Sequence, residues 1–264
     1  MRLGLHALGI GAGAKGDVID SVAIAAEHAG FATLWSGEHV VMVDESASRY
    51  PYSADGQIAV PSAADWLDPM IGLSFVAAAT LDTLSGGRFT MGIGVGWSRE
   101  EFEALGVPFE RRSARTAEYV AAIRTLWRDD VASFGGEFVG FESVRVNPKP
   151  VRAAGIPIVL GGNSDAALRR VAEWGDGWYG FNVEGPAAAA EHVAKIRAWC
   201  EERGRNAATL RLAVALRDPH PSDAAELVDL GIDELVLVEG PPDDAAAAAD
   251  WVADLAARWL PVLS

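Results

Sequence analysis

The chain is poor in cysteine and in basic residues, and it lacks long apolar runs. Cys200 is the single cysteine of 264 residues, which excludes an internal disulfide and any cysteine-based metal cluster. With 22 Lys and Arg against 37 Asp and Glu residues, the net charge is −15, so no nucleic-acid partner is expected. No apolar run approaches the roughly 20 residues of a membrane span, and Met1-Arg2 leads into a predicted strand rather than a signal peptide. We therefore expect a cytoplasmic protein without a membrane partner.

Two common kinds of catalytic site are also missing from the residue spacing. The five histidines show no metal-binding pattern such as H-x-x-x-H, so no metal is expected. No G-x-S-x-G nucleophile elbow is present, and Cys200, between Trp199 and Glu201 in a predicted helix, is interpreted as inert. His6, in the first predicted strand, is interpreted as structural.

Half of the residues are hydrophobic, which is enough for one large core. Predicted strands alternate with predicted helices, a pattern typical of a parallel sheet with helical crossovers. The strands begin near Arg2, Phe31, Arg88, Pro157, Gly177, Leu210 and Glu234. We predict an α/β fold, a TIM-like (β/α)8 barrel, formed by residues 1–264 as a single domain.

The predicted strands number seven, whereas this barrel needs eight. The shortfall lies near Thr80-Leu81, where a helix predicted from Asp68 to about Ser85 continues without a strand. Either the barrel is incomplete there, or part of the insertion Val40–Leu67 supplies the missing strand. Loops of that length inside a compact domain are usually functional lids or disordered.

The stretch Ser85–Trp97 (SGGRFTMGIGVGW) carries the clearest sign of a binding site. Gly92, Gly94 and Gly96 alternate, so on an extended chain they leave one backbone face without side chains. A flat, bulky group can lie directly against such a backbone. We interpret Gly94, Gly96 and Trp97 as the wall of a cofactor pocket at the carboxyl end of a strand. The alternative is that these glycines only allow a tight turn.

A second glycine-rich junction, Gly161, Gly162, Asn163 and Ser164, lies between a predicted strand and a predicted helix. The start of a helix offers unpaired N–H groups and the positive end of its dipole, which favours an anion. The alternative is that Asn163 or Ser164 is only a helix cap.

Glu38 and His39 follow the second predicted strand, at the end where the catalytic groups of barrels gather. A histidine can act as acid or base near neutral pH, and Glu38 could orient it; alternatively, His39 caps a loop carbonyl. Arg49, Tyr50 and Tyr52 belong to the insertion at about 40–67. They are candidates for a lid that contacts substrate or an anion, and an ordinary surface loop is the alternative.

Several segments together resemble the luciferase-like monooxygenase superfamily, in its actinobacterial coenzyme F420-dependent oxidoreductase branch. They are LWSGEH (34–39), SRYPYSADG (48–56), WLDP (66–69), LDTLSGGRFTMGIGVGWSREEFEALGVPF (81–109), PIVLGGNS (157–164) and GDGWYGF (175–181). The resemblance spans nearly the whole chain. It implies a TIM barrel, usually a homodimer, that binds F420 or FMN at the carboxyl-end face of its strands.

The resemblance implies an F420-dependent oxidoreductase that transfers a hydride between the deazaflavin and an unidentified small organic substrate. It places Glu38 and His39 beside the deazaflavin and assigns His39 a proton-transfer or charge-stabilising role. It also assigns the cofactor phosphate to the glycines of 161–164. Some F420 dehydrogenases carry a catalytic glutamate where Trp97 stands, so a sugar-phosphate dehydrogenase reaction is not expected, and Glu100 is a poor substitute.

The chain departs from the family pattern between Thr80 and Leu81. Relatives carry there the third barrel strand, with a bulge and a cis peptide against the ring, and the start of its helix. About one βα unit, roughly 25–30 residues, is missing. A naturally shortened chain and a sequence lacking a disordered segment both fit. Two alternatives therefore stand beside the F420 enzyme: an FMN-dependent monooxygenase and a non-catalytic cofactor-binding paralogue.

Overall fold

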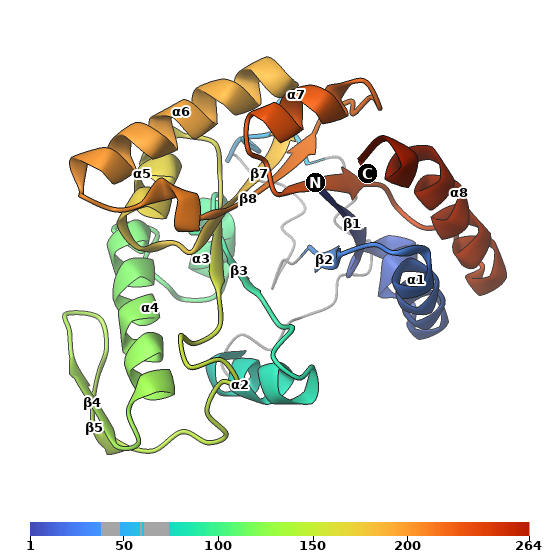
Figure 1. Cartoon of the computed structure of the whole chain (residues 1–264). Helices are drawn as coiled ribbons and strands as arrows, with labels where there is room; N and C mark the ends of the chain where they lie inside the picture. The colour runs from blue at the N-terminus through green and yellow to red at the C-terminus, as the bar shows by residue number, and fades with distance from the viewer. Residues whose placement is uncertain (38–47, 59, 61–73, 264) are drawn as a thin grey trace. The chain divides into compact units, whose positions relative to one another are not determined.

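The computed structural model describes residues 1–37, 48–58, 60 and 74–263, and the chain forms two compact units (Figure 1). The first unit consists of Met1–Met42, Ile58–Asp68 and Leu160–Ser264, and the second of Val43–Gln57 and Pro69–Val159. The single domain expected from the sequence stays a prediction.

The first unit is built on a sheet whose strand order is β2-β1-β9-β8-β7-β6. The strands are β1 (Arg2–Leu8), β2 (Thr33–Ser36), β6 (Ile158–Gly161, its last two residues in this unit), β7 (Gly177–Val183), β8 (Arg211–Leu216) and β9 (Glu234–Val238). β1 pairs in parallel with both β2 and β9, so that Gly4 lies opposite Thr33 on one side and Val236 on the other. β8 is likewise parallel to β7 and β9. Parallel neighbours require crossovers, which here are helices.

The helices of this unit are α1 (Gly16–Ala29), α5 (Asp165–Trp174), α6 (Pro186–Glu202), α7 (Asp223–Asp229) and α8 (Ala245–Leu263). α1 and α8 lie side by side, and α8 also contacts β1 (Figure 1). Leu3 and Leu5 of β1 are buried, as are Val22 of α1 and Leu255 of α8. Because side chains alternate along a strand, His6 lies on the opposite face of β1 from Leu3 and Leu5.

A polar network joins three strands on the face opposite to Leu3 and Leu5. The carboxylate of Glu234 is fully buried, and it accepts hydrogen bonds from Arg211 and from Trp35 Nε1, the latter at 3.0 Å. Arg211 Nη2 also donates to Thr33 Oγ1 at 3.0 Å. A Cβ at Gly4 would collide with the Glu234 carboxylate, so β1 needs glycine at that point. The network thus ties β2, β8 and β9 to one another, and Gly4 of β1 leaves room for it.

The second unit contains α2 (Ser74–Leu84), β3 (Met91–Ile93), α3 (Arg99–Ala104), α4 (Arg112–Arg128), β4 (Ala132–Gly135) and β5 (Gly140–Val144). β3 lies beside the residue that precedes β6, where Met91 N donates to Pro157 O at 2.9 Å. β4 and β5 form the hairpin expected around Gly135-Gly136, and this hairpin lies beside α4 (Figure 1). The carboxylate of Glu118 on α4 holds the turn by accepting N–H bonds from Phe138 and Val139, at 2.6 and 2.9 Å.

Thr80 and Leu81 are consecutive residues of α2, with no strand between them. Over the described residues the main sheet has seven strands, its order ending in β6-β3. The predicted barrel-type fold lacking one βα unit at this point is therefore confirmed. Residues 48–58 form turns and bends rather than a strand. The rest of Val40–Leu67, and the N-terminal part of the helix predicted from Asp68, lie outside the described residues.

Two strands begin later than the sequence predicts, because the preceding helix ends hold their first residues. Phe31 N donates to Ala26 O in the C-terminal turn of α1, so β2 starts at Thr33. Phe89 N donates to Ser85 Oγ after α2, so β3 starts at Met91. Among the described helices, none is long and apolar enough to cross a membrane.

Candidate functional site

The loop Gly94–Trp97 follows β3 in the second unit. Gly92, Gly94 and Gly96 are exposed, whereas Ile93 and Val95 between them are half-buried, so one backbone face is free of side chains. A Cβ at Gly94 would meet no atom within 4 Å, which means that packing does not require glycine there. At Gly96, φ is +78° and a Cβ would stand 2.6 Å from the Phe102 ring, so glycine is required. Gly96 shapes the turn, while Gly94 leaves space beside the backbone.

An aromatic group covers Trp97 in the same unit. The rings of Tyr50 and Trp97 meet edge to face, with centroids 5.2 Å apart, and Tyr52 meets Tyr50 in the same way at 5.4 Å. Burial, together with the charge that Tyr52 could carry, raises the pKa of Tyr50 to about 12. Tyr50 is therefore protonated at neutral pH. The structure brings together three of the side chains predicted to contact cofactor or substrate.

The loop that carries these tyrosines is fastened to the start of α3. Ser48 N donates to Glu100 Oε1 at 3.2 Å, and Ser48 Oγ accepts from Arg99 N at 3.1 Å. Arg49 turns back onto its own loop, where Nη2 donates to Ala54 O at 3.1 Å. Glu100 thus positions the loop through its carboxylate, and the guanidinium of Arg49 closes the loop.

The second glycine junction lies in the first unit, between β6 and α5. Ser164 is the N-cap of α5, and its Oγ accepts a hydrogen bond from Ala167 N at 3.3 Å. The alternative that Ser164 is a helix cap is therefore confirmed for its side chain. Gly162 has φ +111°, and its carbonyl oxygen accepts from Trp178 Nε1 at 3.0 Å. Since Trp178 is fully buried in β7, this bond fixes the junction to the sheet.

Asn163 is bound to the neighbouring strand end and is not the helix cap. Its Nδ2 donates to Phe181 O at 2.8 Å, while its buried Oδ1 has no partner among the described residues. Asp165 in the first turn of α5 is paired with Lys195 Nζ at 2.8 Å. The Gly161–Ser164 junction is therefore held by uncharged hydrogen-bonding groups.

His6 has more polar surroundings than its structural interpretation predicts. Its Nδ1 lies 2.9 Å from the hydroxyl oxygen of Tyr179, whose ring stacks on Trp35 with centroids 4.4 Å apart. Burial lowers the pKa of His6 to about 4, so the imidazole is neutral at physiological pH. At its other nitrogen, a Cβ on Gly37 would stand 3.1 Å from His6 Nε2. His6 therefore reaches the carboxyl end of β2.

The sequence contained a usable signal for His6. In RLGLHAL, the apolar side chains of Leu3, Leu5 and Ala7 alternate with Gly4 and His6. Period-two alternation puts a titratable side chain on the same strand face as a residue without a side chain. Such a residue belongs among the site candidates.

The remaining predicted site residues can be placed only in part. Glu38 and His39 lie outside the described residues. The Gly94–Trp97 loop belongs to the second unit and the Gly161–Ser164 junction to the first. Their convergence on one cofactor mouth stays a prediction.

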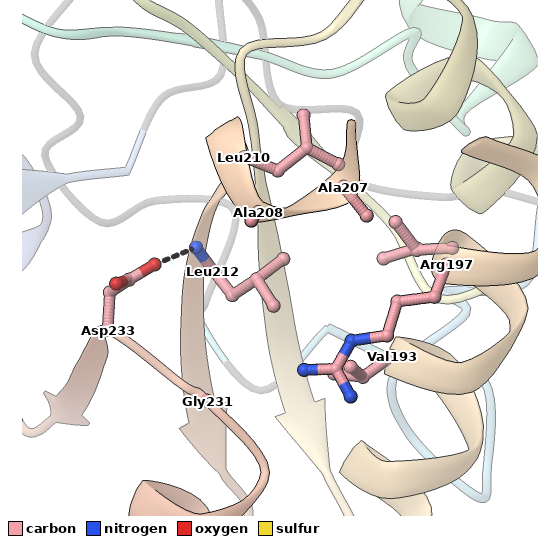
Figure 2. Close-up of a pocket in the computed structure, with 9 residues that line it drawn as sticks. Val193, Arg197, Ala207, Ala208, Leu210, Leu212, Gly231 and Asp233 are labelled. Atoms are coloured by element: carbon pink, nitrogen blue, oxygen red, sulfur yellow. Dashed lines mark hydrogen bonds between the residues drawn. The ribbon is translucent and has the colours of Figure 1, made fainter. Parts of the chain in front are cut away.

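A cavity of about 270 Å³ lies elsewhere in the first unit (Figure 2). It is lined by Val193 and Arg197 of α6, by Leu212 of β8 and by Asp233 before β9, where Leu212 N donates to Asp233 Oδ2 at 2.7 Å. None of the predicted site residues lines it. The cavity lies at the amino ends of β8 and β9, the end of barrel strands associated with stability rather than catalysis.

Parallel strands joined by helices, with glycine-rich turns at their carboxyl ends, define the class of barrel enzymes that bind ligands at those ends. The family follows from the sequence: a model of the family "Luciferase-like monooxygenase" matches residues 69–258, and the chain belongs to this family. Its members are oxidoreductases and monooxygenases, so the predicted enzyme class is confirmed.

Three relatives illustrate the range of this family. An uncharacterized protein of Mycobacterium tuberculosis strain H37Rv is 29% identical over 261 residues, covering 88% of this chain and 90% of that protein. Pyrimidine monooxygenase RutA of Allorhizobium ampelinum is 33% identical over 151 residues, covering 53% of this chain and 40% of RutA. A solved structure of an F420-dependent secondary alcohol dehydrogenase, in complex with an F420-acetone adduct, has a TM-score of 0.72 at 14% identity. That likeness covers 100% of this chain and 99% of the other, and it shows a shared fold.

Proposed function

We propose that this protein is an F420-dependent oxidoreductase that transfers a hydride between the deazaflavin and a small organic substrate. The observation that carries the proposal is the exposed glycine face of Gly92, Gly94 and Gly96 beside Trp97. Family membership supports an oxidoreductase, and the fold that the chain shares with an F420-dependent alcohol dehydrogenase is compatible with a deazaflavin.

The residues present fit a flat, anionic cofactor. A Cβ at Gly94 would meet nothing within 4 Å, so a ring can approach the backbone there. The start of α5 supplies helix N–H groups for a phosphate, as expected for Gly161–Ser164. When bound, the deazaflavin would supply the hydride-accepting or hydride-donating atom.

The chain's own residues would cover the cofactor ring, contact the substrate and transfer a proton. Trp97, Tyr50 and Tyr52 would shield the ring from water and contact the substrate, with Arg49 on the same loop. Glu38 and His39, at the end of β2, would hold or move the proton that accompanies the hydride. His6 stays neutral, because burial keeps its pKa near 4.

Titration of the purified protein with F420 and with FMN, followed by fluorescence, tests this proposal. We expect saturable F420 binding at micromolar concentration and FMN binding at least about 10-fold weaker, a difference of about 1.4 kcal/mol. Preferential FMN binding would replace the proposal with the FMN-dependent monooxygenase, which the similarity to RutA favours. Binding of neither cofactor would favour the non-catalytic paralogue, for which the missing βα unit is the structural reason.

A further inference from the structure

The guanidinium of Arg112, which forms no ion pair among the described residues, lies next to the glycine loop of the second unit. Arg112 is the first residue of α4, and its Nε donates to the carbonyl oxygen of Gly96 at 3.0 Å. Its guanidinium lies over the Phe109 ring, 3.8 Å from the centroid. Arginine 112 is thus fixed by a hydrogen bond and a ring contact beside the loop predicted to bind the cofactor.

The neighbouring arginines donate to carboxylates or to backbone carbonyl oxygens. Arg99 is paired with Glu110 at 2.7 Å, and Arg111 is paired with Glu137. Arg115 donates to two carbonyl oxygens, those of Pro108 and Glu110, at 2.8 and 3.1 Å. Arg112, in contrast, has no hydrogen-bonded or ion-paired carboxylate within the described parts of the chain, and Glu110, which is near enough to raise its pKa, is paired with Arg99.

The surroundings of Arg112 make its charge unfavourable on balance. Its guanidinium is half-buried, and the guanidinium of Arg99 lies over the same Phe109 ring at 4.4 Å. Burial first, and the charge of Arg99 next, lower the pKa of Arg112, and the nearby charge of Glu110, which raises it, offsets them only in part. The first turn of α4 contains no acidic residue, so the positive end of the helix dipole adds to the same potential.

We propose that Arg112 is the anchor of an anion subsite beside Gly96, and that the anion is a phosphate or carboxylate of the cofactor's tail. A guanidinium offers two parallel N–H donors to such an oxyanion. Because Nε of Arg112 donates to Gly96 O, its Nη groups would donate to the anion. The subsite rests on the proposed function, because the cofactor must lie against the same glycine loop. The assignment adds a binding residue to the positions predicted from sequence.

The test compares ligands that share a ring but differ in their tail. F420 carries a phosphate and glutamyl carboxylates, F420 without its glutamates retains the phosphate and a lactyl carboxylate, and the deazaflavin Fo has no anionic tail. Affinities are measured for the wild type, for Arg112→Gln and for Arg112→Lys. The matched control is Arg128→Gln, which removes the same charge from the other end of α4, where Arg128 is paired with Asp129.

We expect Arg112→Gln to weaken F420 binding about 10-fold and to leave Fo binding within about 2-fold, since charge-assisted hydrogen bonds are strong. Arg112→Lys keeps the charge and should recover part of the affinity, and Arg128→Gln should bind as the wild type does. The glutamate-free ligand narrows the anion: sensitivity to Arg112→Gln assigns the phospholactyl group, and insensitivity assigns the glutamyl carboxylates.

Equal losses for F420 and Fo, or no loss for either, would overturn the subsite. Thermal unfolding separates binding from structure, because a structural role predicts that Arg112→Gln lowers the unfolding temperature and weakens both ligands together. The proposed function fails separately, if the wild type does not bind F420 at all. In that event FMN and riboflavin, which differ by a phosphate, replace F420 and Fo in the same comparison.

Discussion

The two glycine-rich strand ends have similar sequences and different surroundings. At Gly161–Ser164, buried uncharged groups hold the backbone: Trp178 binds the Gly162 carbonyl, and Asn163 binds Phe181 O. At Gly94–Trp97, the glycines are exposed, and the guanidinium of Arg112 holds the loop through Gly96 O. The first junction is fixed by the core, and the second is fixed by a charged surface group.

This difference shows that glycine has two roles: at Gly161–Ser164 it belongs to a rigid junction, and at Gly94–Trp97 it leaves the backbone exposed. Burying a hydrogen-bonded carbonyl makes a junction rigid, because breaking the bond leaves a polar atom unsatisfied. An exposed loop can change shape at lower cost and can present charge to a ligand. The first unit is therefore expected to control stability, and the second to control affinity for the cofactor tail.

The largest expected effect tests whether the first unit controls stability. It is the pH dependence of the unfolding free energy that the neutral, buried His6 causes. His6 has a pKa of about 4 in the folded protein against 6.5 when exposed. The unfolded chain therefore binds this proton first, and the stability contributed by the neutral ring is lost as pH falls from 6.5 to 4. The shift corresponds to on the order of 3 kcal/mol in unfolding free energy. Denaturant unfolding between pH 4 and 7 measures it.

Other groups titrate in this window as well, so the control is a difference between two proteins. His6→Gln cannot take up the proton, and its stability should depend less on pH over the same range. Parallel curves for the wild type and His6→Gln would refute the buried neutral histidine. Tyr50, with a pKa of about 12, should contribute nothing below pH 9.

The next largest effect is expected at the bond that fixes the first junction. Trp178→Phe removes the indole N–H and leaves the Gly162 carbonyl without its donor, at a cost of about 2 kcal/mol. Trp199→Phe is the matched control, because Trp199 is half-buried on α6 and lies under the guanidinium of Arg169. Chemical denaturation compares the two, and equal small losses would show that Trp178 does not stabilise the junction.

The smallest expected effect on stability is the difference between alanine substitutions at two glycines of the second loop, Gly96 and Gly94. Gly96→Ala places a Cβ against Phe102 at a φ of +78°, which should cost about 1–2 kcal/mol. Gly94→Ala meets nothing within 4 Å, so stability should change by less than about 0.5 kcal/mol. If Gly94 contacts the cofactor, the same alanine should weaken F420 binding about 10-fold or more. Unchanged F420 affinity in Gly94→Ala would remove this glycine from the binding site.

Much of the fold could be predicted because it depends on local patterns. The hairpin at Gly135-Gly136, the helix after Ser164 and the continuous helix through Thr80-Leu81 all follow from spacing and turn residues. The boundaries of β2 and β3 could not be predicted in this way. They depend on hydrogen bonds from Phe31 to α1 and from Phe89 to Ser85.

The candidate site was predictable only as separate segments. Glycine spacing indicated both junctions, and the aromatic residues Tyr50, Tyr52 and Trp97 were identified without any sign that they touch. For His6, strand alternation indicates the face on which it lies, but not its partner Tyr179, which is 173 positions away along the chain. A local residue pattern cannot predict a partner that lies far along the chain.

By itself, the sequence determined the alternation of strands and helices, the missing βα unit and the membership of a redox-enzyme family, because each depends on local spacing or shared motifs. Only the tertiary structure decided which polar groups have partners. It buried His6 beside Tyr179, capped α5 with Ser164 and left Arg112 without an ion-paired carboxylate in the described chain. The physical reason is that pairing, burial and pKa depend on neighbours that folding brings from far along the chain.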